Sequence, residues 1–199
     1  AASIPEGISL TLSDFSSGML DEARESLSDI NCKCTFSVQD VEALEFEDNE
    51  FDAVLAHFML YHTQDKRKAV SEMKRVVKES GWCGIVLNSA NNLTEFAALA
   101  SQVAPEMKFG DVDSKNFTSE DGILLLKSEF PNVERHRYHC EMKVDDVQLV
   151  VDYAKSAELF DKVELSEEFW IAFEKHLEFK MNTTGYLSFN KFSDLFICR

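Results

Sequence analysis

Polar and apolar residues begin to alternate at residues 8–13, ISLTLS, near the start of the chain. A period of two is typical of a strand with one buried face. Asp14 ends this segment, and the Ser-Ser-Gly stretch shortly after it offers side-chain oxygens suited to cap a helix. From Met19 onward the apolar spacing becomes helical, so we expect an amphipathic helix over residues 17–30.

Further strands and helices follow in alternation. Residues 34–39 alternate like the first strand, residues 51–58 are an almost continuous apolar run, and residues 82–88 are again apolar. A helix with a basic outer face is predicted over residues 65–79, with Gly81 ending it. Alternating strands and helices with short connections predict a mostly parallel sheet covered by helices, which is an α/β fold.

The second half of the chain is less regular. Trp170, Phe173 and Leu177 recur at helical spacing, and we interpret this face as core rather than as an aromatic substrate box. No repeat or linker interrupts the chain, so we expect one domain over residues 1–199. The remaining predicted elements are helices over 92–103, 119–129, 145–158 and 166–181 and strands over 133–142 and 193–199.

The composition narrows the class of partner. A formal net charge of −16 disfavours nucleic acid and anionic membrane surfaces, because both are bound through Lys and Arg. No apolar stretch approaches the roughly 20 residues that cross a bilayer, and no signal-peptide pattern opens the sequence. The five cysteines follow no disulfide or zinc spacing, so we expect no metal site and a cytoplasmic location. A small molecule or a protein is the expected partner.

Three predicted strands end in polar or backbone-exposing groups, at Asp14, at Asp40 and at residues 56–58. Ligands of open parallel sheets bind beyond the carboxyl ends of the strands. An acid after the second strand of such a fold can accept hydrogen bonds from both ribose hydroxyls of a nucleotide. The three strand ends together indicate a nucleoside site, although Asp14 alone also suits a helix cap.

Three stretches resemble the class I S-adenosylmethionine (SAM)-dependent methyltransferases of the small-molecule type, with a domain like methyltransferase types 11 and 25. LTLSDFSSGMLDEAR (10–24) is similar to the family's second-strand motif. SVQDVEALEFEDNEFDAVLAHFMLYHTQD (37–65) is similar to its adenine-contacting acid and fourth strand, and AVSEMKRVVKESGWCGI (69–85) to the helix and turn before the fifth strand. The resemblance implies a Rossmann-like sandwich with an antiparallel last strand and a helical cap insertion over residues 90–160.

The resemblance also implies roles for four residues around the adenosine of SAM, the implied cofactor. Asp14 would hold the ribose hydroxyls, and Phe15 would pack beside the adenosine. Asp40 would accept a hydrogen bond from the adenine amino group, and Val41 would line the ring through its backbone N–H.

On the methionine side of SAM, the resemblance implies that Ala56 and His57 lie beside the cofactor. Tyr61 and His62 are candidates for the substrate side, where a histidine could act as a general base near neutral pH. We assign no catalytic residue, because in-line methyl transfer mainly needs positioning and desolvation.

One departure from the family is large. The family begins with a strand and a Gly-rich loop of the form D-x-G-x-G-x-G, and none of the seven glycines forms such a cluster. We therefore expect this chain to be an N-terminally truncated fragment. The absent strand would lie centrally, between the strands ending at Asp14 and His57, and would leave unpaired edges. The alternative is that those two strands close up.

The leading prediction is a SAM-dependent methyltransferase that acts on a small molecule. In its truncated form this methyltransferase could be inactive. One alternative is a non-catalytic binding module with a degenerate methyltransferase fold that engages a partner protein. Another is an NAD-dependent dehydrogenase, although the sequence has no evident Tyr-x-x-x-Lys pair. The pattern leaves the methyl acceptor and the oligomeric state open.

Overall fold

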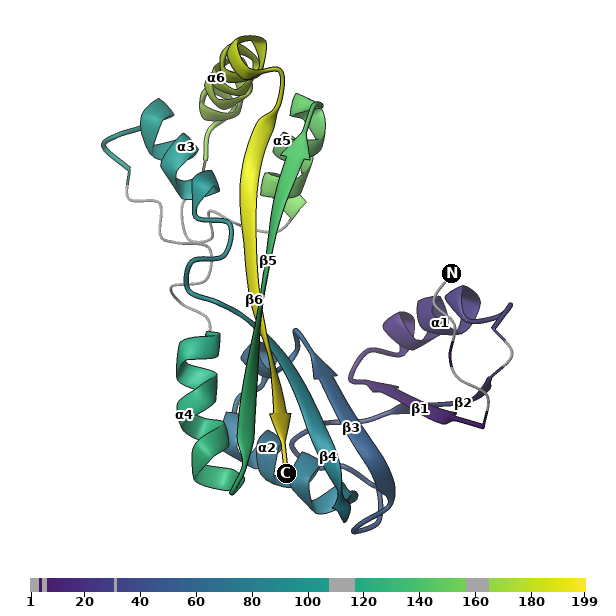
Figure 1. The fold of residues 1–199 in the computed structure, drawn as a ribbon. Helices are drawn as coiled ribbons and strands as arrows, with labels where there is room; N and C mark the ends of the chain where they lie inside the picture. Colours follow the sequence, from purple (N-terminus) through teal and green to yellow (C-terminus); the bar gives the residue numbers. More distant parts are fainter. Residues whose placement is uncertain (1–3, 5–6, 31, 108–116, 157–164) are drawn as a thin grey trace. The chain divides into compact units, whose positions relative to one another are not determined.

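A computed structural model describes residue 4 and residues 7–30, 32–107, 117–156 and 165–199 (Figure 1). The chain forms two compact units. Unit 1 comprises Ala1–Val54 and His62–Trp82, and unit 2 comprises Leu55–Tyr61 and Cys83–Arg199.

Unit 1 begins with a strand, helix and strand as the sequence predicts. These are β1 (Ser9–Asp14), α1 (Ser17–Ser26) and β2 (Lys33–Val38), and the two strands pair in parallel. The helix ends before the predicted residue 30, because the N–H groups of Ser28 and Ile30 bond to the carbonyls three residues back, in turns, rather than four residues back as in an α-helix. Among the described residues, β1 pairs only with β2, so they form a two-stranded sheet.

The next elements are β3 (Phe51–His57), α2 (Lys66–Val76) and β4 (Val77–Asn88). The predicted helix end at Gly81 is wrong, because the strand already begins at Val77 and Gly81 lies inside it. Gly81 has a different reason to be glycine: a Cβ there would lie 2.6 Å from the backbone oxygen of Asp52. The buried face of α2 is the predicted one, Ala69, Val70, Met73 and Val76.

Among its described residues, the rest of unit 2 holds four α-helices and two long strands, β5 (Val133–Val144) and β6 (Leu187–Cys198). The final strand pairs antiparallel with both β4 and β5, which confirms the predicted antiparallel last strand. The four-stranded sheet has the order β3-β4-β6-β5. The elements are η1 (Leu60–His62), α3 (Glu95–Val103), α4 (Ser119–Glu129), β5 (Val133–Val144), α5 (Val147–Ser156), α6 (Glu167–Thr184) and β6 (Leu187–Cys198).

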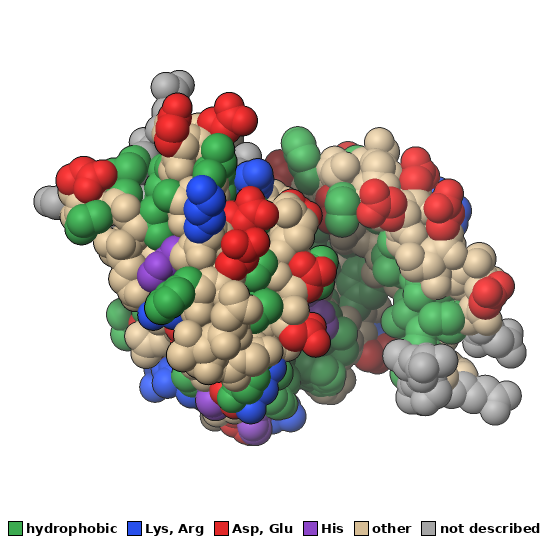
Figure 2. Space-filling model, turned by 90° about the horizontal axis from the view of Figure 1, so that it is seen from above, with side chains coloured by type: hydrophobic (Ala, Val, Ile, Leu, Met, Phe, Trp, Pro, Cys, Tyr) green, Lys and Arg blue, Asp and Glu red, His purple; other side chains and the backbone are tan. Residues whose placement is uncertain are grey.

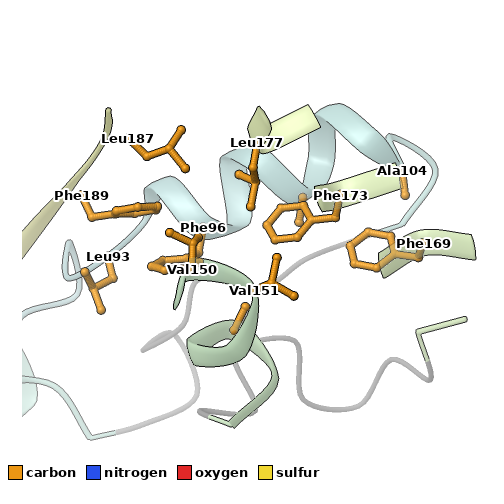
Figure 3. Close-up of a cluster of buried hydrophobic side chains, with 12 residues drawn as sticks. Leu93, Phe96, Ala104, Val150, Val151, Phe169, Phe173, Leu177, Leu187 and Phe189 are labelled. Carbon is orange, nitrogen blue, oxygen red and sulfur yellow. The ribbon is translucent and has the colours of Figure 1, made fainter. Parts of the chain in front are cut away.

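A hydrophobic core fills one end of unit 2, where α3, α5 and α6 gather around the long strands β5 and β6 (Figures 1 and 3). Phe173 and Leu177 are fully buried in it, and Trp170 packs against it. This confirms the interpretation of that helix face as core. Phe96 stacks on Phe189 with ring centroids 4.3 Å apart.

A buried carboxylate ties α4 to β5 and β6 in the same unit. Asp194 is fully buried and accepts hydrogen bonds from Ser119, Arg135 and Arg137. Burial raises the pKa of Asp194, but these hydrogen bonds outweigh it and hold the pKa well below its usual range. Glu120 also forms ion pairs with Arg135 and Arg137, so these residues form a charge network rather than a single ion pair.

The described helices include none that is both long and apolar enough to cross a membrane. Acidic side chains are spread over the face seen in Figure 2, in keeping with the net charge of −16.

Candidate functional site

The carboxyl ends of β1 and β2 form one edge in unit 1. The strands are parallel, with Asp14 in register with Val38, so the segment that begins at Asp40 leaves the sheet at the same edge as Asp14. The Gln39 N–H donates to the Asp14 carbonyl at 3.0 Å and extends the pairing past the end of β2. The structure therefore brings the two predicted adenosine-binding acids to one sheet edge.

The Asp14 carboxylate is exposed and held in a local turn. Its Oδ1 accepts the Ser16 N–H at 2.8 Å. The helix cap is Ser16 itself, whose Oγ accepts the Met19 N–H. The helix is thus capped without Asp14. Because the Asp14 carboxylate is exposed, its remaining lone pairs can accept hydrogen bonds from hydroxyl groups of a ligand. Phe15 is 79% exposed, so its ring is open to a ligand.

Asp40 begins the loop that follows β2. Its Oδ1 accepts the Glu42 N–H at 2.8 Å, and its carbonyl accepts the Ala43 N–H at 2.9 Å. Just before it, Gln39 is buried and accepts the Glu45 N–H through its side-chain oxygen. These bonds fix the backbone around Val41, which is partly buried.

A glutamate and an arginine on α2, one turn apart, hold the rest of this loop. Arg75 donates to the carbonyls of Leu44 and Phe46, both at 2.8 Å. Glu72 accepts two bonds from Arg75 and also the Leu44 N–H at 2.9 Å. Hydrogen bonds from Arg75 lower the pKa of Glu72. We call this pair, Glu72 and Arg75, the loop clamp.

The loop clamp was not predicted from the sequence, because Arg75 belongs to the basic outer face predicted for the helix over residues 65–79. The local signal was the spacing Glu-x-x-Arg, which puts the two side chains on one helix face. A second set of hydrogen bonds that fixes the loop was also not predicted. The Glu42 carboxylate accepts the N–H groups of Gln64 and Asp65, just before α2 begins. The loop that begins at Asp40 is thus fixed at several points.

The other predicted site residues lie at the end of β3 and in the segment just after it. Ala56 is buried and His57 is exposed, both at the end of the strand within unit 2. Tyr61 and His62 lie in the short helix η1, and Tyr61 is partly buried. The cofactor-side and substrate-side roles of these four residues stay predictions. Among the described residues, no group of three or more His, Cys, Asp or Glu is placed to hold a metal ion.

Comparison with known proteins finds similarity in the first part of the chain. A family model described as "Methyltransferase domain" matches residues 2–85. A ubiquinone/menaquinone biosynthesis C-methyltransferase of Geotalea uraniireducens is 33% identical over 50% of this chain and 43% of its own length. A demethylmenaquinone methyltransferase of Renibacterium salmoninarum is 40% identical over 38% of this chain and 30% of its own length. The chain thus spans less than half of these relatives.

Solved structures extend the comparison to the whole fold. The methyltransferase-like BH2331 of Bacillus halodurans C-125 aligns over 95% of this chain and 81% of its own, with a TM-score of 0.61 and 19% identity. YcgJ of Bacillus subtilis aligns over the same shares with a TM-score of 0.60 and 18% identity. The [4+2]-cyclase SpnF also aligns, over 96% of this chain and 67% of its own, with a TM-score of 0.54 and 15% identity. The shared fold therefore does not by itself fix the reaction.

Proposed function

We propose that the chain transfers a methyl group from SAM to a small molecule, because the methyltransferase-domain model matches residues 2–85, the part of the sequence that carries the predicted motifs. The relatives it matches are named for methylation of quinone precursors and, in Cereibacter sphaeroides, of phosphatidylethanolamine. The strongly acidic composition favours a substrate that is not a polyanion. We further propose that residues 1–199 act as one domain, with residues 90–160 as the substrate-side cap.

The observation that carries this proposal is the shared edge of β1 and β2. Asp14 and Asp40 leave the sheet at this edge, each with its carboxylate exposed. Such carboxylates suit the donors of an adenosine, because they accept hydrogen bonds from hydroxyl and amino groups. The residues present therefore fit the adenosine part of SAM.

When bound, SAM supplies a methyl group on a positively charged sulfur, ready for in-line displacement. Asp14 would hold the two ribose hydroxyls, while Asp40 would hold the adenine amino group. The exposed Phe15 ring would cover apolar surface of the nucleoside, and the fixed backbone at Val41 would present its N–H to the adenine. The contribution of these residues is orientation, which in-line transfer depends on.

Ligand binding tests the proposal. We expect S-adenosylhomocysteine to bind the protein in isothermal titration, and both Asp14→Asn and Asp40→Asn to weaken binding by about tenfold or more, because each removes a charged acceptor. Asp29→Asn is the matched control, since Asp29 is an exposed acid of unit 1 away from the strand ends.

Two results would overturn the proposal. The assignment of the site fails if the Asp14 and Asp40 variants bind S-adenosylhomocysteine as tightly as the Asp29 control. The methyltransferase function fails if NADH binds in the same titration and S-adenosylhomocysteine does not, because the sheet edge then serves a dehydrogenase.

A further inference from the structure

Unit 2 contains an apolar cavity of about 270 Å³ beside its hydrophobic core. It is lined by residues from the start of α3, from α5 and from strands β5 and β6. Most of the lining belongs to residues 90–160, the predicted cap. The principal lining residues are Leu93, Phe96, Val150, Tyr153, Phe189 and Lys191.

Aromatic rings make up much of the cavity wall. Phe96 stacks on Phe189, and Tyr153 lies against Phe96 with ring centroids 5.6 Å apart. Leu93, Phe96, Val150 and Phe189 come together in Figure 3 from separate elements. Two lining side chains stay open to water, because Leu149 is 61% and Tyr153 45% exposed. An apolar ligand that fills the cavity would remove this surface from water.

One cation borders the cavity. Lys191 lines it, and its Nζ lies 5.3 Å from the centroid of the Phe58 ring. Phe58 directly follows His57 at the end of β3, and its backbone has a positive φ of 51°. Within the part of the chain that the structure describes, no carboxylate is within ion-pair distance of Lys191. Although the chain has a net charge of −16, this ammonium can bind the anionic group of a ligand.

We propose that this cavity binds the methyl acceptor, and that the acceptor is a small apolar molecule with one anionic group. Its apolar body would fill the space beside Phe96 and Phe189, and its carboxylate or phenolate would pair with Lys191. The contact between Lys191 and Phe58 connects this cavity to the end of β3, next to His57. The identification of the ligand as the methyl acceptor rests on the proposed methyltransferase function. The binding site itself is inferred from the cavity alone.

Simple amphiphiles test the site without knowledge of the acceptor. We expect octanoate to bind the protein in isothermal titration, and octanol and octylammonium, of the same chain length, to bind about tenfold more weakly or worse, because they lack the negative charge. Lys191→Met should remove the preference for octanoate over octanol. Lys175→Met, at an exposed position of α6, should leave the preference intact.

A second variant tests the cavity rather than the charge. Leu149→Trp enlarges an exposed side chain that lines the cavity, so it should block octanoate and leave the circular dichroism spectrum and melting temperature unchanged. Leu124→Trp is the matched control, because Leu124 is 72% exposed on α4. The inference is wrong if octanol binds as well as octanoate, or if Leu149→Trp binds octanoate like the Leu124→Trp control.

The two proposals can fail separately. If octanoate binds as expected and S-adenosylhomocysteine does not, the cavity is a ligand site of a protein that is not a methyltransferase. If S-adenosylhomocysteine binds and octanoate fails the variants above, the function stands and this acceptor site is refuted.

Discussion

Units 1 and 2 of the chain present contrasting kinds of candidate site. The family match, residues 2–85, covers almost all of unit 1. It includes only residues 55–61 and 83–85 of unit 2. In unit 1 the candidate acids follow strand ends and are exposed. In unit 2 the candidate cavity is assembled from four elements around a twelve-residue buried cluster. The proposed cofactor site is thus encoded locally, whereas the proposed acceptor site depends on packing.

The largest expected effect is on the core of unit 2. Phe173→Ala removes a fully buried ring and should cost about 3–5 kcal/mol of unfolding free energy. Urea unfolding followed by Trp170 fluorescence, in a Trp82→Phe background, would measure it, because the Trp170 and Phe173 rings are in contact. Phe179→Ala is the control on the same helix, since Phe179 is 69% exposed.

This experiment also tests the contrast between the units. We expect the octanoate site to be lost at urea concentrations that unfold Phe173→Ala, because the cavity is part of the same packing. A variant with unchanged stability would show that the cluster around Phe173 is not the core on which the cavity depends.

A smaller effect is expected at the loop clamp in unit 1. Arg75→Ala removes hydrogen bonds to two loop carbonyls and to Glu72, and should cost about 2 kcal/mol. Hydrogen exchange should accelerate at the amide of Leu44, because the Glu72 carboxylate that accepts its N–H loses its Arg75 partner. Binding of S-adenosylhomocysteine should weaken, because the loop begins at Asp40.

The matched control is another acid–arginine pair at the same spacing. Asp21 and Arg24 pair on α1, but both side chains are more than half exposed. Arg24→Ala should therefore cost about 1 kcal/mol or less, because it removes an exposed ion pair and the contact of the guanidinium with the Phe36 ring, whose centroid is 4.8 Å away. Equal losses from the two arginine variants would mean that the loop clamp adds nothing beyond a surface ion pair.

The smallest effect concerns two glycines of unit 1. Gly81→Ala should cost about 1 kcal/mol, because the new Cβ meets the Asp52 backbone oxygen and the strand must shift. Gly18→Ala should instead stabilise by up to about 1 kcal/mol, since it lies in α1 with only the Ser16 Oγ nearby, at 3.6 Å. Thermal unfolding would show whether the melting temperature falls for Gly81→Ala and rises for Gly18→Ala, as expected. A stabilising Gly81→Ala would contradict the close approach.

Most strands and helices could be predicted from the sequence, because their apolar spacing is a local property. The strand that ends at Asp14 and the helix of residues 119–129 are found as predicted. The end of α2 could not be predicted in this way. Val76 and Val77 continue the apolar pattern without a break, and only strand pairing decides that the helix stops there and β4 begins.

For the candidate site, the residues proposed to bind adenosine could be named from the sequence, since acids at strand ends and family motifs are local features of the chain. The tertiary structure decided that Asp14 and Asp40 share one edge, because that depends on parallel pairing of β1 with β2. It also decided the loop clamp and the cavity beside Lys191, which join residues that are distant in sequence. Such contacts arise from packing, which has no periodic signal in the chain.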